Sequence, residues 1–289
     1  MLVDVAGLTL RLPTRVDGRR AWVHAATDLS LTLQAGRLRA LVGESGCGKS
    51  ILASALVGML PHGTRASGTV IIDGTDVSGA LTSPRAAVWD RLRGRVVGRV
   101  PQSSATFLTP TRTVGAQLAE TVRWLDGPLP PDALARRVRL PEPALDRYPH
   151  ELSGGMAGRA AVAFALAGDP RVLVADEPTA SLDPELTEHV LGLLRGCADE
   201  GRAVLLITHD LQSLTTTGVA DDLSVEYAGR LVDDGPAAGL LAHPTVDYTR
   251  ALVAALPANG LHAAPGMPPA LTDLTDGVRF ADRLSEAAR

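Results

Sequence analysis

The sequence predicts an α/β protein: a parallel-sheet core with an antiparallel β subdomain and an inserted helical subdomain. Two continuous apolar runs, 171–179 and 203–210, are typical of strands covered on both faces. A helical pattern at 184–201 lies between them, and strand–helix–strand order indicates parallel strands. A glycine-rich loop at 43–48 separates an apolar strand from a helical pattern. Prolines among short helical patterns predict the helical subdomain at about 103–167.

The elements before the helical subdomain follow from alternation and from turn residues. Alternating patterns predict strands at 2–12 and 27–36, the second ending in a turn at Gly36. A third strand, 37–43, runs into the glycine loop, and helical periodicity follows over 50–60 until Pro61. The segment 68–77 is predicted to be a strand with a turn at Asp73-Gly74.

The elements after it show the same mixture of signals. A helix is predicted at 113–125, and prolines cluster at 126–132 and 140–149. Residues 223–235 indicate a hairpin, 247–256 a helix, and the Pro/Gly-rich tail from Pro257 an irregular segment. We find no internal repeat.

Composition limits the class of protein. Apolar residues make up 45% of the 289 residues, and the formal net charge is −4 without a long basic run, which argues against nucleic acid as the main partner. Two cysteines, Cys47 and Cys197, favour a reducing compartment. The first residues lack a secretory-signal pattern, and the longest apolar helical run is too short to span a bilayer. We therefore expect a soluble chain that reaches a membrane only through partners.

The glycine loop reads G-E-S-G-C-G-K-S and matches the phosphate-binding pattern G-x-x-x-x-G-K-[ST] between a strand and a helix. Its backbone N–H groups and the helix N-terminus favour phosphate, Lys49 is placed for the β- and γ-phosphates, and the Ser50 hydroxyl for Mg²⁺. The alternative is a chance glycine turn, which the strand and helix context disfavours. The expected phosphate-binding residues are Gly43, Glu44, Ser45, Gly46, Cys47, Gly48, Lys49, Ser50 and Ile51.

Cys47 lies inside this loop. We interpret it as a small filler residue. A second hypothesis is that Lys49 and the helix N-terminus lower the pKa of its thiol, so that alkylation would block nucleotide binding.

Two acids and a histidine end neighbouring strands. Asp176 follows an apolar strand and is a candidate Mg²⁺ ligand, and Glu177 beside it is a candidate general base. His209 ends the next strand. Taken alone, strand-end acids often face solvent. Because the carboxyl ends of parallel strands meet in one crevice, we expect all three residues near the phosphates.

The stretch "YPHELSGGM" at 148–156 resembles the signature of ATP-binding subunits of ABC transporters. The order of motifs is also similar: the phosphate loop, Gln102, "LSGGM", "VLVADE", "ASLD" and "ITHD". The segments "VGESGCGKS", "VEYAGRLVDDGP", "HPTVDYTRALVAALP" and "PGMPPALTDL" resemble the oligopeptide, dipeptide and nickel importer branch.

The resemblance implies a P-loop NTPase core of the ABC ATPase type over residues 1–256, with a C-terminal extension at 257–289. It implies Ser50, Gln102 and Asp176 as the Mg²⁺ site, and Glu177, His209 and Gln102 as the catalytic residues for ATP hydrolysis. The signature Leu152, Ser153, Gly154, Gly155 and Met156 would act on nucleotide held by a facing subunit, beside a D-loop of Ser181, Leu182 and Asp183.

The resemblance also implies partners. These are a second ABC ATPase subunit in a heterodimer, two transmembrane permeases and an extracytoplasmic substrate-binding protein, with this chain peripheral on the cytoplasmic face of the membrane. ATP and Mg²⁺ would power uptake of peptides, or of nickel or a metal chelate, through the permeases.

The sequence departs from the family at several places, one of which is a short helical subdomain between Glu120 and Tyr148. Leu12 stands where an aromatic residue usually stacks on adenine, and the nearest aromatic is Trp22. Ala157 and Gly158 replace a basic residue and a glutamine after the signature. No cysteine follows Cys197, so no iron–sulfur cluster is expected in the tail.

Three alternatives stay open at this point. A soluble ABC ATPase of repair or translation usually has tandem cassettes or long coiled-coil insertions, which this sequence lacks. An exporter motor disagrees with the importer-like tail motifs. A non-hydrolysing regulatory partner in an asymmetric heterodimer is disfavoured by intact Glu177 and His209, although Leu12 and Ala157-Gly158 favour it.

Overall fold

The computed structural model describes residues 1–103, 106–180, 182–262, 264–272, 274 and 280–287. The strands are β1 (Val3–Val16), β2 (Arg19–Leu33), β3 (Leu38–Val42), β4 (Arg65–Ile72), β5 (Thr75–Asp76), β6 (Val97–Val100), β7 (Val172–Asp176), β8 (Ala203–Thr208), β9 (Asp222–Tyr227) and β10 (Arg230–Pro236). The α-helices are α1 (Lys49–Leu56), α2 (Val88–Leu92), α3 (Val114–Leu125), α4 (Pro131–Arg137), α5 (Gly154–Ala165), α6 (Pro184–Asp199), α7 (Leu211–Thr217), α8 (Ala237–Ala242), α9 (Asp247–Ala254) and α10 (Phe280–Ala287), with short 3-10 turns between some of them.

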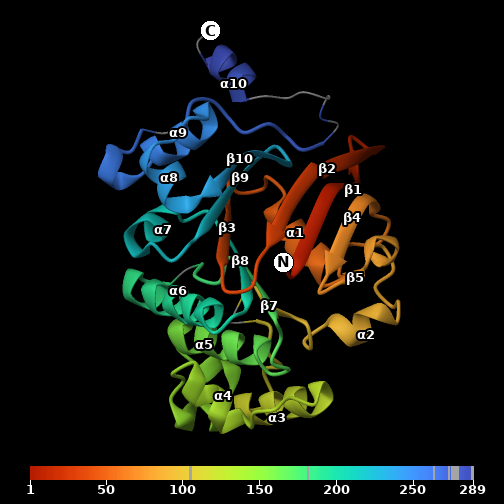
Figure 1. Cartoon of the computed structure of the whole chain (residues 1–289), viewed down its shortest axis with the longest axis vertical. Coiled ribbons are helices and arrows are strands. Elements are labelled where there is room, and N and C mark those ends of the chain that lie inside the picture. Colours follow the sequence, from red (N-terminus) through yellow and green to blue (C-terminus); the bar gives the residue numbers. More distant parts are fainter. Residues whose placement is uncertain (104–105, 181, 263, 273, 275–279, 288–289) are drawn as a thin grey trace.

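The central sheet has the strand order β10-β9-β3-β8-β7-β6 (Figure 1). Strands β9, β3, β8, β7 and β6 are parallel, and β10 is antiparallel to β9. Every residue of β3, β7 and β8 is buried, which explains their uninterrupted apolar sequences. The predicted parallel pair and the predicted hairpin at 223–235 are confirmed.

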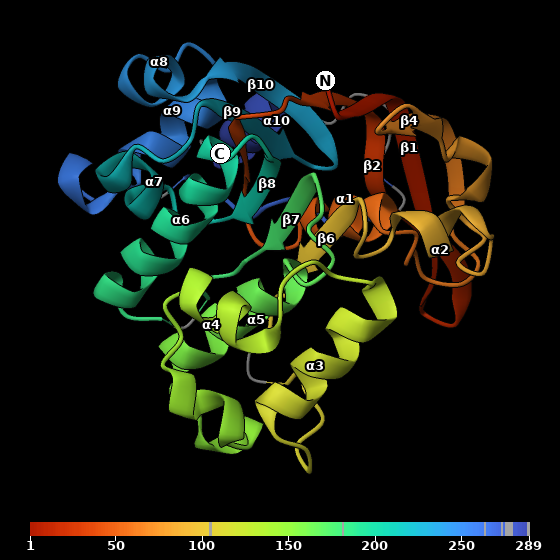
Figure 2. The same cartoon turned by 60° about the horizontal axis from the view of Figure 1, so that its bottom comes forward.

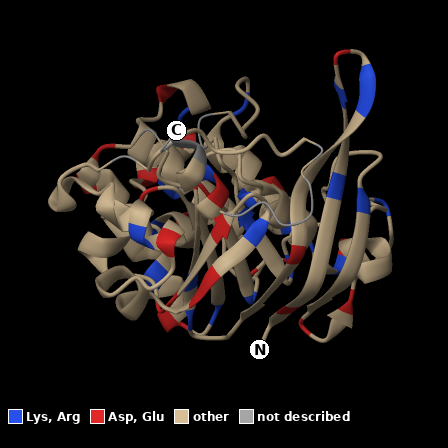
Figure 3. Cartoon of the chain, turned by 90° about the horizontal axis from the view of Figure 1, so that it is seen from above, with Lys and Arg blue, Asp and Glu red and all other residues tan. Residues whose placement is uncertain are grey.

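The second sheet is antiparallel, with the order β2-β1-β4-β5. Its outer hairpin is longer than the sequence predicted, because β1 continues to Val16 and β2 already begins at Arg19. This extension is mostly exposed and rich in arginine, so backbone pairing rather than an apolar face continues the strands. Figure 3 shows basic positions gathered at its projecting end.

The helices α3, α4 and α5 follow β6 and precede β7, and they gather on one side of the molecule (Figure 2). Their buried residues, among them Val114, Leu118 and Leu134, belong to the same hydrophobic cluster as one face of the central sheet. The other face of the central sheet shares its cluster with α1 and the antiparallel sheet. The phosphate loop therefore connects β3 of the central sheet to α1, which packs with the antiparallel sheet.

The tail contains a helix that the sequence did not predict. Phe280 in α10 packs against Tyr227 and Tyr248, with ring centroids 5.6 and 5.1 Å away. The tail was expected to be irregular because its composition is Pro/Gly-rich. A long-range aromatic contact orders the end of the chain instead.

Candidate functional site

The glycine loop connects the end of β3 to α1, and two of its glycines allow close backbone packing. A Cβ atom on Gly48 would lie 2.1 Å from the carbonyl oxygen of Ala25, and one on Gly43 would lie 2.3 Å from that of Glu226. Real Cβ atoms do not approach so closely, and Gly48 also has a φ of +124°. Glycine at these places is therefore required by the way the loop lies on β2 and β9.

Lys49 is buried beneath this loop. Its Nζ donates to the carbonyl oxygens of Gly43 at 2.8 Å and Glu44 at 2.9 Å. The ammonium group thus lies inside the loop's curve, where a phosphate oxygen would be attracted to it. The predicted position of Lys49 in the loop agrees with this geometry.

Ser50 and Asp176 meet from two different elements. The Ser50 Oγ donates to Asp176 Oδ1 at 2.8 Å, and Arg99 on β6 donates to Asp176 Oδ2 at 3.0 Å. Asp176 is fully buried at the end of β7. A hydroxyl beside a carboxylate supplies the oxygen ligands that Mg²⁺ prefers.

Glu177 and His209 end adjacent parallel strands, as expected. His209 Nδ1 lies 2.9 Å from the Glu177 carboxylate. Glu177 has a φ of +48°, a left-handed backbone conformation that non-glycine residues rarely adopt, while its N–H donates to Ile207 O at 2.8 Å. Such strained residues concentrate at functional sites, and this conformation turns the acid out of the β7 line.

A cavity of about 280 Å³ collects the predicted phosphate and metal residues. Lys49, Ser50, Gln102 and Glu177 line it, so residues from the loop, from the segment after β6 and from the end of β7 face one space. Asp176 borders this group through Ser50. His209 and Glu177 also line a neighbouring cavity of about 520 Å³.

The signature residues lie elsewhere on the chain. Ser153 is the N-cap of α5, and its side chain accepts a hydrogen bond from the Met156 N–H at 3.3 Å. Of the residues that the structure describes, none of the signature lines the phosphate-loop cavity. Gly154 and Ser153 are exposed, so they are free to meet another molecule.

The D-loop is described in part. Ser181 lies outside the described residues. Asp183 is the N-cap of α6 and accepts a 2.9 Å hydrogen bond from the Leu186 N–H, while Leu182 lines the cavity beside His209. Ala157 and Gly158, the departures after the signature, are buried in α5, where a Cβ on Gly158 would meet Val190 at an ordinary 3.5 Å.

The hypothesis of a reactive Cys47 thiol is wrong. Burial, together with the nearby carboxyl of Glu226, raises the pKa of Cys47 to about 12, although Lys49 acts in the opposite direction. Desolvation outweighs the lysine because the thiol is only 7% exposed. The filler interpretation of Cys47 agrees with this burial.

Glu226 is a buried acid that sequence reasoning missed. Its side chain lies on β9 under the loop, where a Cβ on Gly48 would be 2.6 Å from its Oε1. Neither carboxyl oxygen has a hydrogen-bond partner among the described residues. Burial raises the pKa of Glu226 to about 8, and Lys49 acts against that rise. The alternation of apolar and polar residues in β9 predicts that this side chain faces solvent, but every residue from Leu223 to Tyr227 is buried.

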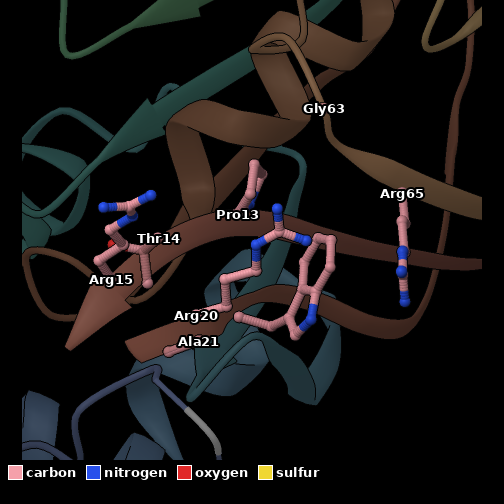
Figure 4. Close-up of a pocket in the computed structure, with 8 residues that line it drawn as sticks. Pro13, Thr14, Arg15, Arg20, Ala21, Gly63 and Arg65 are labelled. Atoms are coloured by element: carbon pink, nitrogen blue, oxygen red, sulfur yellow. The ribbon is translucent and has the colours of Figure 1, made fainter. Parts of the chain in front are cut away.

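Trp22 does not face the phosphate-loop cavity. It lines a separate cavity of about 580 Å³ at the β1–β2 hairpin with Pro13, Arg15 and Arg20 (Figure 4). The Arg65 guanidinium lies 4.2 Å from the centre of its ring. Leu12 pairs with Val23 and Pro13 with Trp22, and successive pairs on a hairpin face opposite sides. Leu12 and Val23 therefore face the phosphate loop and Trp22 does not.

Arg99 and the partners of Glu44 were also missed by sequence reasoning. Glu44 accepts hydrogen bonds from Arg283 at 2.6 Å and from the Tyr248 hydroxyl at 3.2 Å. Both donors lie about two hundred residues further along the chain. No local pattern marks such contacts.

The site fits a nucleoside triphosphate with Mg²⁺. The loop presents a buried lysine, the first turn of α1 presents a hydroxyl, and a buried carboxylate faces that hydroxyl. These groups lie at the carboxyl ends of parallel strands, where ligands bind in open α/β sheets. Fold and site together are those of a phosphate-loop nucleotide-binding protein.

Comparison with known proteins gives the family. The family model described as ABC transporter matches residues 26–180. A probable peptide ABC transporter ATP-binding protein of Sinorhizobium fredii is 35% identical, over 98% of this chain and 87% of its own length. A probable D,D-dipeptide transport ATP-binding protein of Escherichia coli is 35% identical, over 98% of this chain and 88% of its own. The chain belongs to the ATP-binding proteins of the ABC transporter family.

Solved structures agree on the fold. A dimeric, post-hydrolysis ATP-binding cassette bound to ADP and Pi superimposes with a TM-score of 0.66 at 22% identity, covering 82% of this chain and 99% of that chain. A nucleotide-free cassette from an ABC transporter gives 0.65 at 19% identity, covering 86% and 98%. The expected ABC ATPase fold is confirmed.

No helix in the described part of the chain is both long enough and apolar enough to cross a bilayer.

Proposed function

We propose that this chain is the ATP-hydrolysing motor subunit of an importer for peptides or chemically related cargo. The observation that carries the proposal is the convergence of Lys49, Ser50 and Glu177 on one cavity, with His209 in contact with Glu177. The relatives named as peptide and D,D-dipeptide transport proteins support the choice of cargo. Nickel or a metal chelate is the alternative cargo.

Each of these residues has a separate proposed role in ATP hydrolysis. The loop N–H groups and Lys49 bind and orient the triphosphate. Ser50, Asp176 and Gln102 would hold Mg²⁺, which neutralises charge that develops on the phosphates. Glu177 accepts a proton from the attacking water, and its strained backbone directs the carboxylate into the cavity. His209 holds the Glu177 carboxylate. From the strand end it would also contact the γ-phosphate.

We infer that a complete site needs two ATPase subunits. The exposed Ser153 and Gly154 at the start of α5 form an anion-binding helix N-terminus that does not line this chain's own loop cavity. The similar cassette bound to ADP and Pi is dimeric, which supports the arrangement. We propose a heterodimer with a second ABC ATPase, in which each signature, with its D-loop, faces the other subunit's nucleotide.

The remaining partners are proposed to be two permeases and an extracytoplasmic binding protein, with this chain on the cytoplasmic face of the membrane. A mostly apolar cavity of about 660 Å³ lies between β6 and the helical layer, lined by residues that include Met59, Phe107 and Phe164. It adjoins Pro101, next to Gln102. A permease segment seated there would be coupled to the nucleotide through Gln102.

The domain organisation remains a proposal as well. We propose an ATPase domain over 1–256, whose helical subdomain covers about 103–167, and an extension over 257–289. The position of α3, α4 and α5 between β6 and β7 supports the helical subdomain.

Replacing Glu177 with glutamine tests the hydrolysis step. In the assembled transporter, Glu177→Gln is expected to lower ATP turnover by at least about 100-fold while ATP binding is kept, because an amide cannot accept the proton. Glu188→Gln, an exposed acid on α6, is the matched control and should leave turnover unchanged. An unchanged rate in Glu177→Gln would remove Glu177 as the base and favour a regulatory, non-hydrolysing subunit.

Affinity purification from native membranes in mild detergent, followed by mass spectrometry, tests the partners. Two multi-span permeases and a second ATPase would support the importer, and an accompanying binding protein would indicate the cargo. Recovery of only soluble partners, ribosomes or DNA would overturn the transport assignment.

A further inference from the structure

Both polar and aliphatic side chains line the phosphate-loop cavity. Lys49 and Ser50 follow the loop, and Leu12, Val23 and Ala25 come from β1 and β2. No aromatic side chain is among the described residues that line it. A planar base that extends from a triphosphate on the loop would therefore meet aliphatic groups.

The C-terminal extension supplies a further aliphatic group, Leu271. Leu271 lines the phosphate-loop cavity together with Lys49, and it also lines an adjoining cavity of about 370 Å³ together with Glu44 and Ser45. It is thus the residue of the tail that joins both spaces around the loop.

Backbone hydrogen bonding holds this part of the tail in place. The His24 N–H donates to the Leu271 carbonyl oxygen at 2.8 Å. Thr272 forms an antiparallel bridge with Val23, which is itself one of the cavity's aliphatic residues. The tail therefore continues the surface of the antiparallel sheet at the point where a base would lie.

A second tail contact reaches the loop itself. The Arg283 guanidinium binds both carboxylate oxygens of Glu44, at 2.6 and 3.2 Å, and also donates to the Gly266 carbonyl at 3.0 Å. Arg283 is only 6% exposed. The Tyr248 hydroxyl accepts from the Glu44 N–H at 3.1 Å, so Glu44 is held through both its side chain and its backbone.

We propose that the C-terminal extension is part of the nucleotide site: Leu271 contacts the purine base with Leu12 and Val23, and Arg283 positions the loop through Glu44. This inference rests on the proposed ATP-binding function of the loop. In this arrangement, aliphatic residues from β1, β2 and the tail of one chain contact the base in place of a stacked aromatic ring. Leu271 is a base-contacting residue, and Arg283 is a positioning residue.

The two roles predict different losses. The base is the only part of ATP that Leu271 is proposed to contact, so its truncation should weaken ATP binding and leave the binding of a ligand without a base unchanged. Arg283 acts on the loop, so its loss should weaken the binding of both ATP and the base-free ligand. Inorganic tripolyphosphate is the base-free probe, measured beside ATP by calorimetry with Mg²⁺ on the full chain.

For Leu271→Ala we expect about fivefold weaker ATP binding and unchanged tripolyphosphate binding, from the loss of about one to two buried methylene contacts. Met267→Ala is the matched control, because Met267 is in the tail, 84% exposed, and absent from both cavities. Leu271→Phe enlarges the side chain instead and should strengthen ATP binding without changing tripolyphosphate binding. Its melting temperature is compared with that of the parent chain to show that the fold is kept.

The Arg283→Gln variant should weaken ATP and tripolyphosphate by the same factor, with Arg250→Gln on the exposed face of α9 as its control. Equal loss of both ligands in Leu271→Ala, or no loss of either, would overturn the base contact. The base contact would also be overturned if the unmodified parent chain bound ATP no more tightly than tripolyphosphate. Lys49→Ala separates the two proposals: if it weakens neither ligand, the proposed function itself fails.

Discussion

The Ser50 hydroxyl donates a 2.8 Å hydrogen bond to Asp176, which joins the first turn of α1 to the end of β7. Asp176 also pairs with Arg99, so a fully buried carboxylate has one neutral and one cationic partner. A buried carboxylate needs such partners, because burial otherwise favours its neutral form. The Ser50–Asp176 pair therefore connects the helix that follows the phosphate loop to the end of β7.

Removing the hydroxyl tests this connection. We expect Ser50→Ala to raise the Mg²⁺ concentration for half-maximal ATP binding by about tenfold, since the proposed metal ligand and one orienting hydrogen bond are lost. Titration of Mg²⁺ at constant ATP measures it. Ser54→Ala is the matched control one turn later, where the hydroxyl only donates to the Ser50 carbonyl oxygen at 3.0 Å. A shift of the same size in both variants would contradict a metal role for Ser50.

Much of this site could be predicted because its signals are local. The loop motif, the apolar strands and the strand-end residues Glu177 and His209 are each read from a few neighbouring positions. Parallel topology then brings the strand ends together without further information. The Arg99–Asp176 pair could not be predicted, because it depends on the register in which Arg99 pairs with Val174 across β6 and β7.

Contacts between distant segments account for most of what the sequence did not reveal. The tail looked irregular from its composition, yet Phe280 packs against Tyr227 and Tyr248, and Arg283 in the same helix binds Glu44. Phe280 and Arg283 are single residues in the tail, so they form no periodic pattern from which a helix or a contact could be predicted. The second hypothesis for Cys47, a lowered thiol pKa, failed for a related reason: Glu226 of β9, which helps to raise that pKa, lies far along the chain.

Cys47 is expected to resist alkylation in the folded protein. A pKa of about 12 instead of the ordinary 9.0 lowers the fraction of thiolate at pH 8 by about a thousandfold. Iodoacetamide should therefore react with the folded protein at least about 100-fold more slowly than with the unfolded chain. Mass spectrometry of a Cys197→Ser background follows this one thiol. Rapid labelling of folded protein, with nucleotide present or absent, would contradict the buried position.

Two loop glycines offer a matched comparison. Gly46→Ala should lower the free energy of unfolding by about 1–2 kcal/mol, because Gly46 has a φ of +84° but open space around a new Cβ. Gly48→Ala should cost about 3 kcal/mol or more, because the new Cβ would also meet the Ala25 carbonyl at 2.1 Å. Urea unfolding measures both. Equal effects would show that the loop moves away from β2 without difficulty.

Glu226 predicts how stability changes with pH. Burial raises its pKa from 4.5 to about 8 in the folded state. Between these values the folded chain keeps a proton that the unfolded chain releases, so the free energy of unfolding falls as pH rises through the window and levels off above it. Glu226→Gln removes this dependence. The stability of the variant relative to the parent should therefore rise from pH 5 to pH 8.5, by on the order of 3 kcal/mol.

Urea unfolding of both chains at several pH values across that range gives the difference directly, because groups common to the two chains cancel. Glu188→Gln, an exposed substitution of the same kind, should show a difference that does not vary with pH. A constant difference for Glu226→Gln would mean that the carboxyl stays ionised beneath the loop. In that case the attraction of Lys49 for the Glu226 carboxylate would have to outweigh the effect of burial.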